Sequence, residues 1–171
     1  MRVRADGQGM SVQGEGEMRA KAGYIGIDPG AKGAFALYSA DVVYAWDFNP
    51  ATTFKAIEEL ALNYRIQLVY LERVHSQPGN SGKSMFAFGD NFGWWRGILE
   101  AMRLPCQLVE PKKWQACYSI GGKEKGKDAP SLAVARRLFP SVALDCKCHD
   151  GRADALLIAY YAAQTDPNGR K

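Results

Sequence analysis

Apolar residues recur along the chain with two different spacings, which predict strands and helices. Short apolar runs that end at turn-forming residues are typical of strands, whereas apolar residues three or four positions apart are typical of helices. The predicted strands are Tyr24–Asp28, Ala34–Tyr38, Val42–Trp46, Gln67–Glu72 and Cys106–Val109. The predicted helices are Phe54–Ala61, Ser84–Met102, Lys112–Cys117, Pro130–Phe139 and Arg152–Thr165. We therefore expect an α/β domain.

The connections between these elements predict the topology of the sheet. Short connections join the first three strands, which predicts an antiparallel meander. Thr52 or Thr53 is expected to cap the helix that follows. That helix is part of a crossover, and a crossover makes the fourth strand parallel to a strand already in place. The expected architecture is a mixed five-stranded sheet with flanking helices.

The length of 171 residues predicts a single domain. Residues 1–22 mix glycines with charged and small polar types, so we expect a flexible N-terminal tail, a domain over residues 23–165 and a short C-terminal tail over residues 166–171. Apolar types make up 47% of the chain and charged types 23%, which is enough apolar material for a buried core. No apolar run is long enough to cross a membrane and no secretory signal is evident, which predicts a cytoplasmic location.

Four cysteines, Cys106, Cys117, Cys146 and Cys148, are expected to be free thiols, because nothing else in the sequence indicates an oxidising compartment. Cys146, Cys148 and His149 have the spacing of one half of a zinc site. A structural zinc site needs a second ligand pair at a fixed spacing, and the sequence has none. Zinc is therefore not expected.

Two carboxylates stand at the ends of apolar strands, where burial is unfavourable for a charge. Asp28 ends the run Tyr24–Ile27, and Glu72 ends the run Leu68–Leu71. A buried carboxylate is costly unless a cation or a hydrogen-bond donor compensates it. Each acid also has an ordinary explanation: Asp28 precedes a Pro-Gly pair that is typical of turns, and Glu72 could pair with Arg73 or a lysine.

Asp150 and Asp154 open the last helix four residues apart, so both lie on one face about one turn apart. Their ordinary explanations are an N-cap for Asp150 and a favourable first-turn charge for Asp154. Together with Asp28 and Glu72, they would form an all-oxygen site suited to Mg²⁺. Two such ions about 4 Å apart can activate water and stabilise the leaving oxygen in phosphodiester hydrolysis.

Three motifs in order resemble RuvC-type Holliday junction resolvases, members of the RNase H-like nuclease superfamily. The motifs are Ile25–Gly30, Val69–Val74 and His149–Leu156, and the resemblance extends from about Tyr24 to Tyr161. It implies an RNase H-like fold, and it assigns metal-binding and catalytic roles to Asp28, Glu72, Asp150 and Asp154. Bacterial RuvC spaces the last two acids three residues apart, whereas the spacing of four found here is closer to the phage and plastid resolvases. Either Asp150 or the adjacent His149 then supplies the third ligand.

The resemblance also implies a mechanism and partners. The enzyme would be an endodeoxyribonuclease that uses Mg²⁺, with Mn²⁺ as a substitute, at two ions per subunit. A homodimer would resolve a four-way DNA junction by paired symmetric nicks in strands of like polarity. A lysine just before the penultimate helix would assist electrostatically, and Lys127 is the expected residue, with Lys125 next. The Asp28 turn is also similar to the phosphate loop of actin-like sugar kinases, but these need two such domains, so no nucleotide cofactor is expected.

The net charge of +4 is unevenly distributed. Seven basic residues and two acidic ones lie between Pro111 and Arg137, and lysines that follow phosphates bind DNA without sequence preference. The loop after Glu72 lies where the family inserts residues at the junction centre. The expected DNA contacts are His75, Lys83, Lys112, Lys113, Lys123, Lys125 and Lys127.

Each expected DNA contact also has an ordinary explanation, namely a solvated lysine or a surface histidine. The aromatic residues of the long predicted helix, Trp94 and Trp95 among them, are expected mostly to pack. Two other functions stay open. One is an RNase H-like nuclease for flaps, forks or RNA–DNA hybrids, and the other is a non-catalytic DNA-binding module with structural acids.

Overall fold

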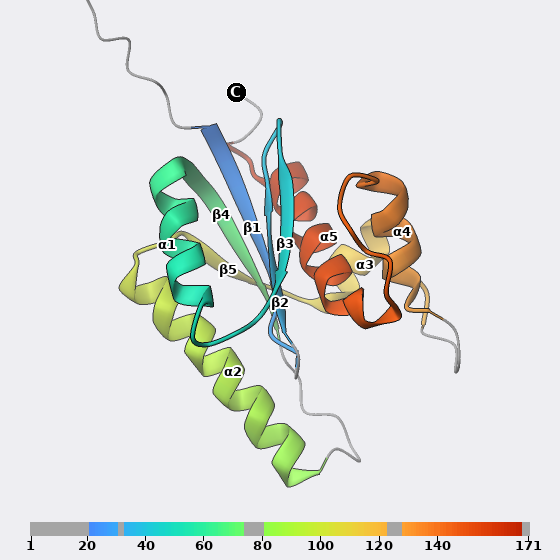
Figure 1. Cartoon of the computed structure of the whole chain (residues 1–171), viewed down its shortest axis with the longest axis horizontal. Coiled ribbons are helices and arrows are strands. Elements are labelled where there is room, and N and C mark those ends of the chain that lie inside the picture. Colours follow the sequence, from blue (N-terminus) through green and yellow to red (C-terminus); the bar gives the residue numbers. More distant parts are fainter. Residues whose placement is uncertain (1–20, 31–32, 74–80, 123–127, 169–171) are drawn as a thin grey trace, which may run out of the picture.

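The structure is a computed structural model that describes residues 21–30, 33–73, 81–122 and 128–168. Within these residues, a five-stranded sheet has the strand order β3-β2-β1-β4-β5 (Figure 1). The strands are β1 (Lys21–Asp28), β2 (Ala34–Tyr38), β3 (Val43–Asp47), β4 (Tyr64–Glu72) and β5 (Cys106–Val109). β2 runs antiparallel to β1 and β3, whereas β4 is parallel to β1 and β5 is parallel to β4. The mixed five-stranded sheet is therefore confirmed.

Helices flank this sheet on both sides (Figure 1). They are α1 (Thr53–Asn63), α2 (Gly82–Ala101), α3 (Pro111–Cys117), α4 (Pro130–Leu138), the short 3₁₀ helix η1 (Lys147–His149) and α5 (Asp150–Thr165). No helix in the described ranges is both long and apolar enough to cross a membrane.

Different helices cover the two faces of the sheet (Figure 1). On one face, Phe35 and Leu37 of β2 belong to a core cluster that includes buried residues of α1 and α2. On the other face, Ala34 and Ala36 pack in a cluster with α3, α4 and α5. Successive side chains of a strand point to opposite faces, which explains this division. Of the three β2 residues on this face, Ala34 and Ala36 are small, and Tyr38 contacts Tyr160 of α5 with its ring.

α5 is the most enclosed helix of the described chain, with buried residues on every side. These residues are Ala153, Ala155, Leu156, Leu157, Ile158, Ala159 and Ala162. A helix that is apolar all round belongs to the core of a domain. The charged residues of α5, Asp150, Arg152 and Asp154, all lie in its first turns.

Several element boundaries differ from those predicted. β1 begins at Lys21, and Ala22 is paired with Arg65 of β4, so these two residues belong to the sheet rather than to a tail. α5 begins at Asp150, two residues before its predicted start. Thr52 occupies the N-cap position of α1, but its side chain makes no capping hydrogen bond. The ends of elements depend on contacts with distant segments, which periodicity alone does not report.

The prediction of four free thiols is wrong for one pair, because a disulfide joins Cys146 to Cys148. Cys106 and Cys117 are free and exposed. The paired cysteines flank Lys147 at the start of η1, and this tight turn brings their Cα atoms to 5.1 Å, within the range that a disulfide spans. The backbone turn thus allows the Cys146–Cys148 disulfide, which was not expected because nothing in the sequence indicated an oxidising compartment.

Candidate metal and catalytic site

A tight turn holds Asp28 at the end of β1. Its Oδ1 accepts a hydrogen bond of 2.9 Å from the Gly30 N–H, and the Gly33 N–H donates to Gly30 O at 2.8 Å. From α2, the Asn91 side-chain amide donates to Gly30 O at 2.9 Å and to Pro29 O at 3.3 Å. The turn that the sequence suggested is therefore present, and it also fixes the direction of the Asp28 carboxylate.

Glu72 lies beside Asp28 because the parallel strands β1 and β4 end together. Ile27 of β1 is paired with Leu71 of β4, so the next residues along the two strands are Asp28 and Glu72. Two carboxylates that follow apolar strands are thus brought to the same edge of the sheet. The predicted crossover makes β4 parallel to a strand already in place, and the structure shows that this strand is β1.

The Glu72 carboxylate accepts a hydrogen bond from the Trp114 indole, whereas the adjacent Arg73 forms an ion pair with Glu110. The Trp114 Nε1–H of α3 donates to Glu72 Oε1 at 2.7 Å. Arg73, the expected alternative partner, is paired with Glu110 at 3.0 Å. Glu72 therefore has no Arg73 ion pair that would explain its place in the fold.

Asp28, Asp150 and Asp154 line one hollow of about 260 Å³. It lies where β1 ends and α5 begins, so the two motifs, far apart in the sequence, meet there. The other residues that line it are Gly30, Gly33, Asp47, Cys148 and Gly151. Glu72 does not line this hollow, although the charges of Asp28 and Asp154 reach it. Three of the four predicted acids thus share the hollow, and the fourth is close enough for the charges of Asp28 and Asp154 to act on it.

Gly151 keeps space open beside the Asp28 carboxylate. A Cβ atom at position 151 would lie 3.2 Å from Asp28 Oδ2 and 3.6 Å from the Ala34 Cβ. Such an atom would stand in front of the carboxylate oxygen that the Gly30 N–H does not take. Glycine therefore lets the first turn of α5 approach Asp28 without covering that oxygen.

Burial and mutual repulsion raise the pKa values of two acids. Burial raises the pKa of Asp28 to about 6; the Gly30 N–H opposes this effect, and the charge of Asp150 adds to it. Burial raises the pKa of Glu72 to about 8, the charge of Asp28 adds to it, and the Trp114 hydrogen bond opposes it. Burial and neighbouring carboxylates therefore disfavour the charged forms of Asp28 and Glu72, as at many functional sites.

The chemistry of these residues fits a hard divalent cation. Carboxylate oxygens are the ligands that Mg²⁺ prefers, and the space beside Asp28 Oδ2 gives a cation access to one of them. Among the described residues, no three acidic, histidine or cysteine side chains are grouped tightly enough to hold a metal ion as they stand. His149, the alternative ligand, accepts a hydrogen bond of 3.4 Å from the Cys146 N–H at its Nδ1.

Replacing Glu72 with glutamine should stabilise the metal-free protein at pH 8. The unfolded state releases the Glu72 proton near pH 4.5 and the folded state retains it to about pH 8, so the folded state is the more protonated one between these values. Wild-type stability therefore falls as the pH rises through this window, and a neutral glutamine avoids that loss. We expect a gain of about 1–3 kcal/mol at pH 8 and almost none at pH 4.5, measured by urea unfolding in EDTA.

Glu59→Gln, an exposed change on α1, is the matched control and should leave stability unchanged at both pH values. Added Mg²⁺ should stabilise wild type at pH 8 and remove the advantage of the Glu72→Gln variant. A glutamine variant that is less stable than wild type at pH 8 would contradict the assignment of an uncompensated charge to Glu72.

The predicted DNA-binding residues are described only in part. Lys112 and Lys113 are exposed in the first turn of α3, immediately before Trp114. Lys83 lies in α2, but its side chain is outside what the structure describes, and so are the residues His75, Lys123, Lys125 and Lys127. The predicted contacts of these lysines and of the histidine therefore stay predictions.

The sequence did not predict the roles of three residues that support the site. Trp114 binds Glu72, Asn91 binds the Asp28 turn, and Arg152 binds Asp47 through two hydrogen bonds of 2.7 and 2.5 Å. The last pair joins the end of β3 to the first turn of α5. A tryptophan in a short helix and an asparagine in a long one do not by themselves indicate such contacts, because their partners are distant in the sequence.

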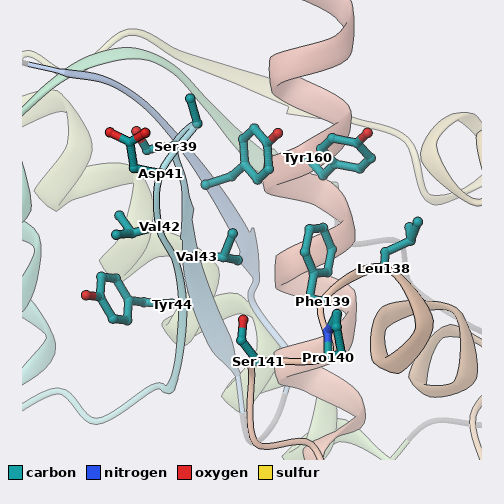
Figure 2. A pocket seen from close by; sticks show the side chains of 12 residues that line it. Ser39, Asp41, Val42, Val43, Tyr44, Leu138, Phe139, Pro140, Ser141 and Tyr160 are labelled. Carbon is teal, nitrogen blue, oxygen red and sulfur yellow. The ribbon is translucent and has the colours of Figure 1, made fainter.

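A larger hollow, of about 510 Å³, lies away from these acids (Figure 2). Figure 2 shows Asp41–Tyr44 on one side of it and Leu138–Ser141 on the other, with Tyr160 projecting from α5 above Phe139. Tyr38, which also lines it, is paired with Tyr24, whereas Ala34 at the other end of β2 is paired with Asp28. This hollow is therefore at the opposite end of the strands from the candidate site.

Comparison with solved structures identifies the fold. The chain is similar to Thermus thermophilus RuvC in complex with a Holliday junction substrate, with a TM-score of 0.54, 15% identity, and coverage of 84% of this chain and 94% of that chain. A second structure of T. thermophilus RuvC gives a TM-score of 0.50 at 15% identity and covers 84% of this chain and 95% of that one. The fold is therefore RuvC-like, which confirms the predicted RNase H-like class.

Comparison of sequences points to one branch. Over 95 residues the chain is 38% identical to the chloroplastic Holliday junction resolvase MOC1 of Chlamydomonas reinhardtii. The match covers 54% of this chain and only a tenth of the length of that relative. No protein-family model matches the chain. The resemblance to RuvC-type resolvases, nearest the plastid branch, is thus confirmed.

Proposed function

We propose that this chain is a Mg²⁺-dependent endodeoxyribonuclease that resolves four-way DNA junctions. The observation that carries the proposal is the meeting of Asp28, Asp150 and Asp154 around one hollow, with Glu72 within reach of the charges of Asp28 and Asp154, in a RuvC-like fold. The sequence match to a plastid Holliday junction resolvase supports the choice of substrate. The reaction is hydrolysis of a phosphodiester bond in each of two strands.

Asp28, Glu72, Asp150 and Asp154 are the residues that would hold two Mg²⁺ ions, or Mn²⁺ in their place. When bound, the metal supplies Lewis-acid chemistry, which activates water and neutralises charge on the leaving oxygen. The chain itself orients these ligands. The Gly30 N–H holds one oxygen of Asp28, and Asn91 holds the turn in which Gly30 lies.

Exposed lysines supply the contacts to the DNA backbone in this proposal. Lys112 and Lys113 are exposed on α3, the helix that also carries Trp114 to Glu72, and in this proposal they bind phosphates beside the acids. Lys127 would stabilise charge that develops on the scissile phosphate, and Lys125 is the alternative. His75, Lys83, Lys123 and Lys125 extend the contacts, His75 by stacking on a base.

We propose a homodimer as the active form, because one small domain contacts only part of a four-way junction and each subunit would cut one strand. No nucleotide cofactor is part of this proposal. The proposed location is the cytoplasm, either at a nucleoid or in an infected host cell. An organellar location is the alternative that the chloroplastic relative favours.

A cleavage assay with several substrates tests this proposal. With Mg²⁺, the full chain should nick a fixed four-way junction in two opposed strands of like polarity, at symmetric positions that a ligase can seal. It should act at least about tenfold faster on the junction than on a fork, a 5′ flap or an RNA–DNA hybrid of the same sequence, and EDTA should stop it. Preferred cutting of any other substrate would instead identify a related nuclease, and binding without cutting would identify a DNA-binding module.

A further inference from the structure

Trp114 is buried, and its indole N–H donates a hydrogen bond to the Glu72 carboxylate. Its side chain is 1% exposed and packs in the core cluster with Leu132 and Leu144. α3 begins directly after β5, whose Val109 is paired with Glu72. The parallel strands thus carry the indole and the carboxylate to the same edge of the sheet, and the 2.7 Å hydrogen bond joins them there.

An indole N–H can only donate a hydrogen bond to a carboxylate such as that of Glu72. Its nitrogen carries one proton and has no acceptor capacity, so it bonds one carboxylate oxygen in every state of the site. An amide or a hydroxyl could turn and offer a lone pair instead. Because Trp114 is fixed by core packing, its N–H points in one direction, and it takes Oε1 and leaves Oε2 unbonded by it.

Burial alone does not force a tryptophan of this protein into such a bond. Trp95 of α2 is also fully buried, and its Nε1 has no hydrogen-bond partner among the described residues. Trp95 packs in the core on the other face of the sheet, with Phe35 and Phe48 as ring neighbours. Both tryptophans are buried, but the Trp114 Nε1–H donates a hydrogen bond to Glu72 and the Trp95 Nε1–H has no acceptor among the described residues. Trp95 is therefore a matched control.

We propose that Trp114 is a positioning residue, which holds the Glu72 carboxylate so that one oxygen is bound by the protein and the other is presented to a divalent cation. This inference rests on the proposed function, because it assumes that Glu72 is a metal ligand. The indole does not touch the cation or the DNA. It acts by lowering the freedom of Glu72, as hydrogen-bond partners of metal ligands commonly do.

The affinity of the full chain for Mn²⁺ without DNA tests the inference directly. Electron paramagnetic resonance measures the concentration of unbound Mn²⁺, from which the affinity follows. Trp114→Phe removes the N–H and keeps an aromatic ring, and it should weaken Mn²⁺ binding about tenfold. Trp95→Phe removes the same group from the other core cluster and should bind as wild type does. In junction cleavage, the Mg²⁺ concentration at half-maximal rate should rise about tenfold for Trp114→Phe, with junction affinity unchanged.

A double-mutant cycle separates positioning from general loss of packing. In a Glu72→Gln background, Trp114→Phe should add little further loss of Mn²⁺ affinity, because the indole acts through the charge that glutamine lacks. Equal Mn²⁺ affinity for Trp114→Phe and wild type would overturn the inference and leave the proposed function intact. If wild type neither bound Mn²⁺ nor cut the junction, both would be overturned.

A spectroscopic measurement on wild type keeps the inference falsifiable should Trp114→Phe fail to fold. The chain contains four tryptophans, so a ¹H–¹⁵N correlation spectrum should show four indole N–H signals. Substitution of Trp46, Trp94 and Trp95, one at a time, assigns three of them and leaves the fourth to Trp114. Addition of Mg²⁺ should shift the Trp114 signal and leave the Trp95 signal in place. A Trp114 signal that did not respond to saturating Mg²⁺ would overturn the inference.

Discussion

Replacing Asp28 with asparagine should abolish the nicking of a four-way junction while the protein still folds and binds the junction. Asparagine keeps the shape of the side chain and an oxygen that can accept the Gly30 N–H, but it removes the charge that Asp28 brings to the hollow shared with Asp150 and Asp154. We expect the rate to fall about a thousandfold or more, or about 4 kcal/mol in activation free energy. Single-turnover cleavage with Mg²⁺, beside a gel-shift assay of binding, measures both quantities.

Asp41→Asn provides the control for this experiment. Asp41 is an exposed carboxylate that pairs with Lys21 at 2.7 Å and lines the hollow at the far end of the strands. Its replacement should leave cleavage and junction binding unchanged. Wild-type nicking by the Asp28→Asn variant would show that the acids are structural, and the chain would then be a DNA-binding module or cut by another site.

The placement of the acids was predictable in part, because it depends on local patterns and on one rule of topology. Asp28 and Glu72 each end an apolar strand, and the crossover rule predicts that the second strand is parallel to one already in place. That this strand is β1, which brings the two residues together, comes from the structure. The spacing of Asp150 and Asp154 places both on one face of a helix whatever the helix packs against. The strand-end positions and the helix spacing need no knowledge of the tertiary contacts.

The supporting contacts were not predictable because they join segments distant in the sequence. The Trp114 indole and Glu72 are 42 positions apart, and Arg152 and Asp47 are 105 apart. Nothing in the local sequence of either partner indicates the other. The Cys146–Cys148 disulfide was missed for a different reason, since the prediction relied on the expected compartment and not on the turn that η1 makes.

Gly26→Ala should unfold the protein or destabilise it by about 3 kcal/mol or more. A Cβ atom at position 26 of β1 would lie 2.9 Å from the Ala159 Cα, and nearer still to Ala155 O and Ala159 N. All three atoms belong to the backbone of α5, so no side chain can turn away to make room. The strain would be relieved only by moving α5 off the sheet, which also separates Asp154 from Asp28. Urea unfolding followed by circular dichroism measures the loss.

Gly97→Ala is the matched change, because a Cβ at this exposed position of α2 would meet nothing within 4 Å. Alanine is favoured over glycine inside a helix, so this variant should gain about 0.5–1 kcal/mol of stability. If Gly26→Ala lowers stability and Gly97→Ala raises it, glycine is required at position 26 because the α5 backbone lies so close to β1 there. A Gly26→Ala variant with wild-type stability would mean that α5 does not lie against β1 as described. The shared hollow of Asp28, Asp150 and Asp154 would then lose part of its structural basis, because the packing of α5 on β1 helps to bring the first turns of α5 to the end of β1.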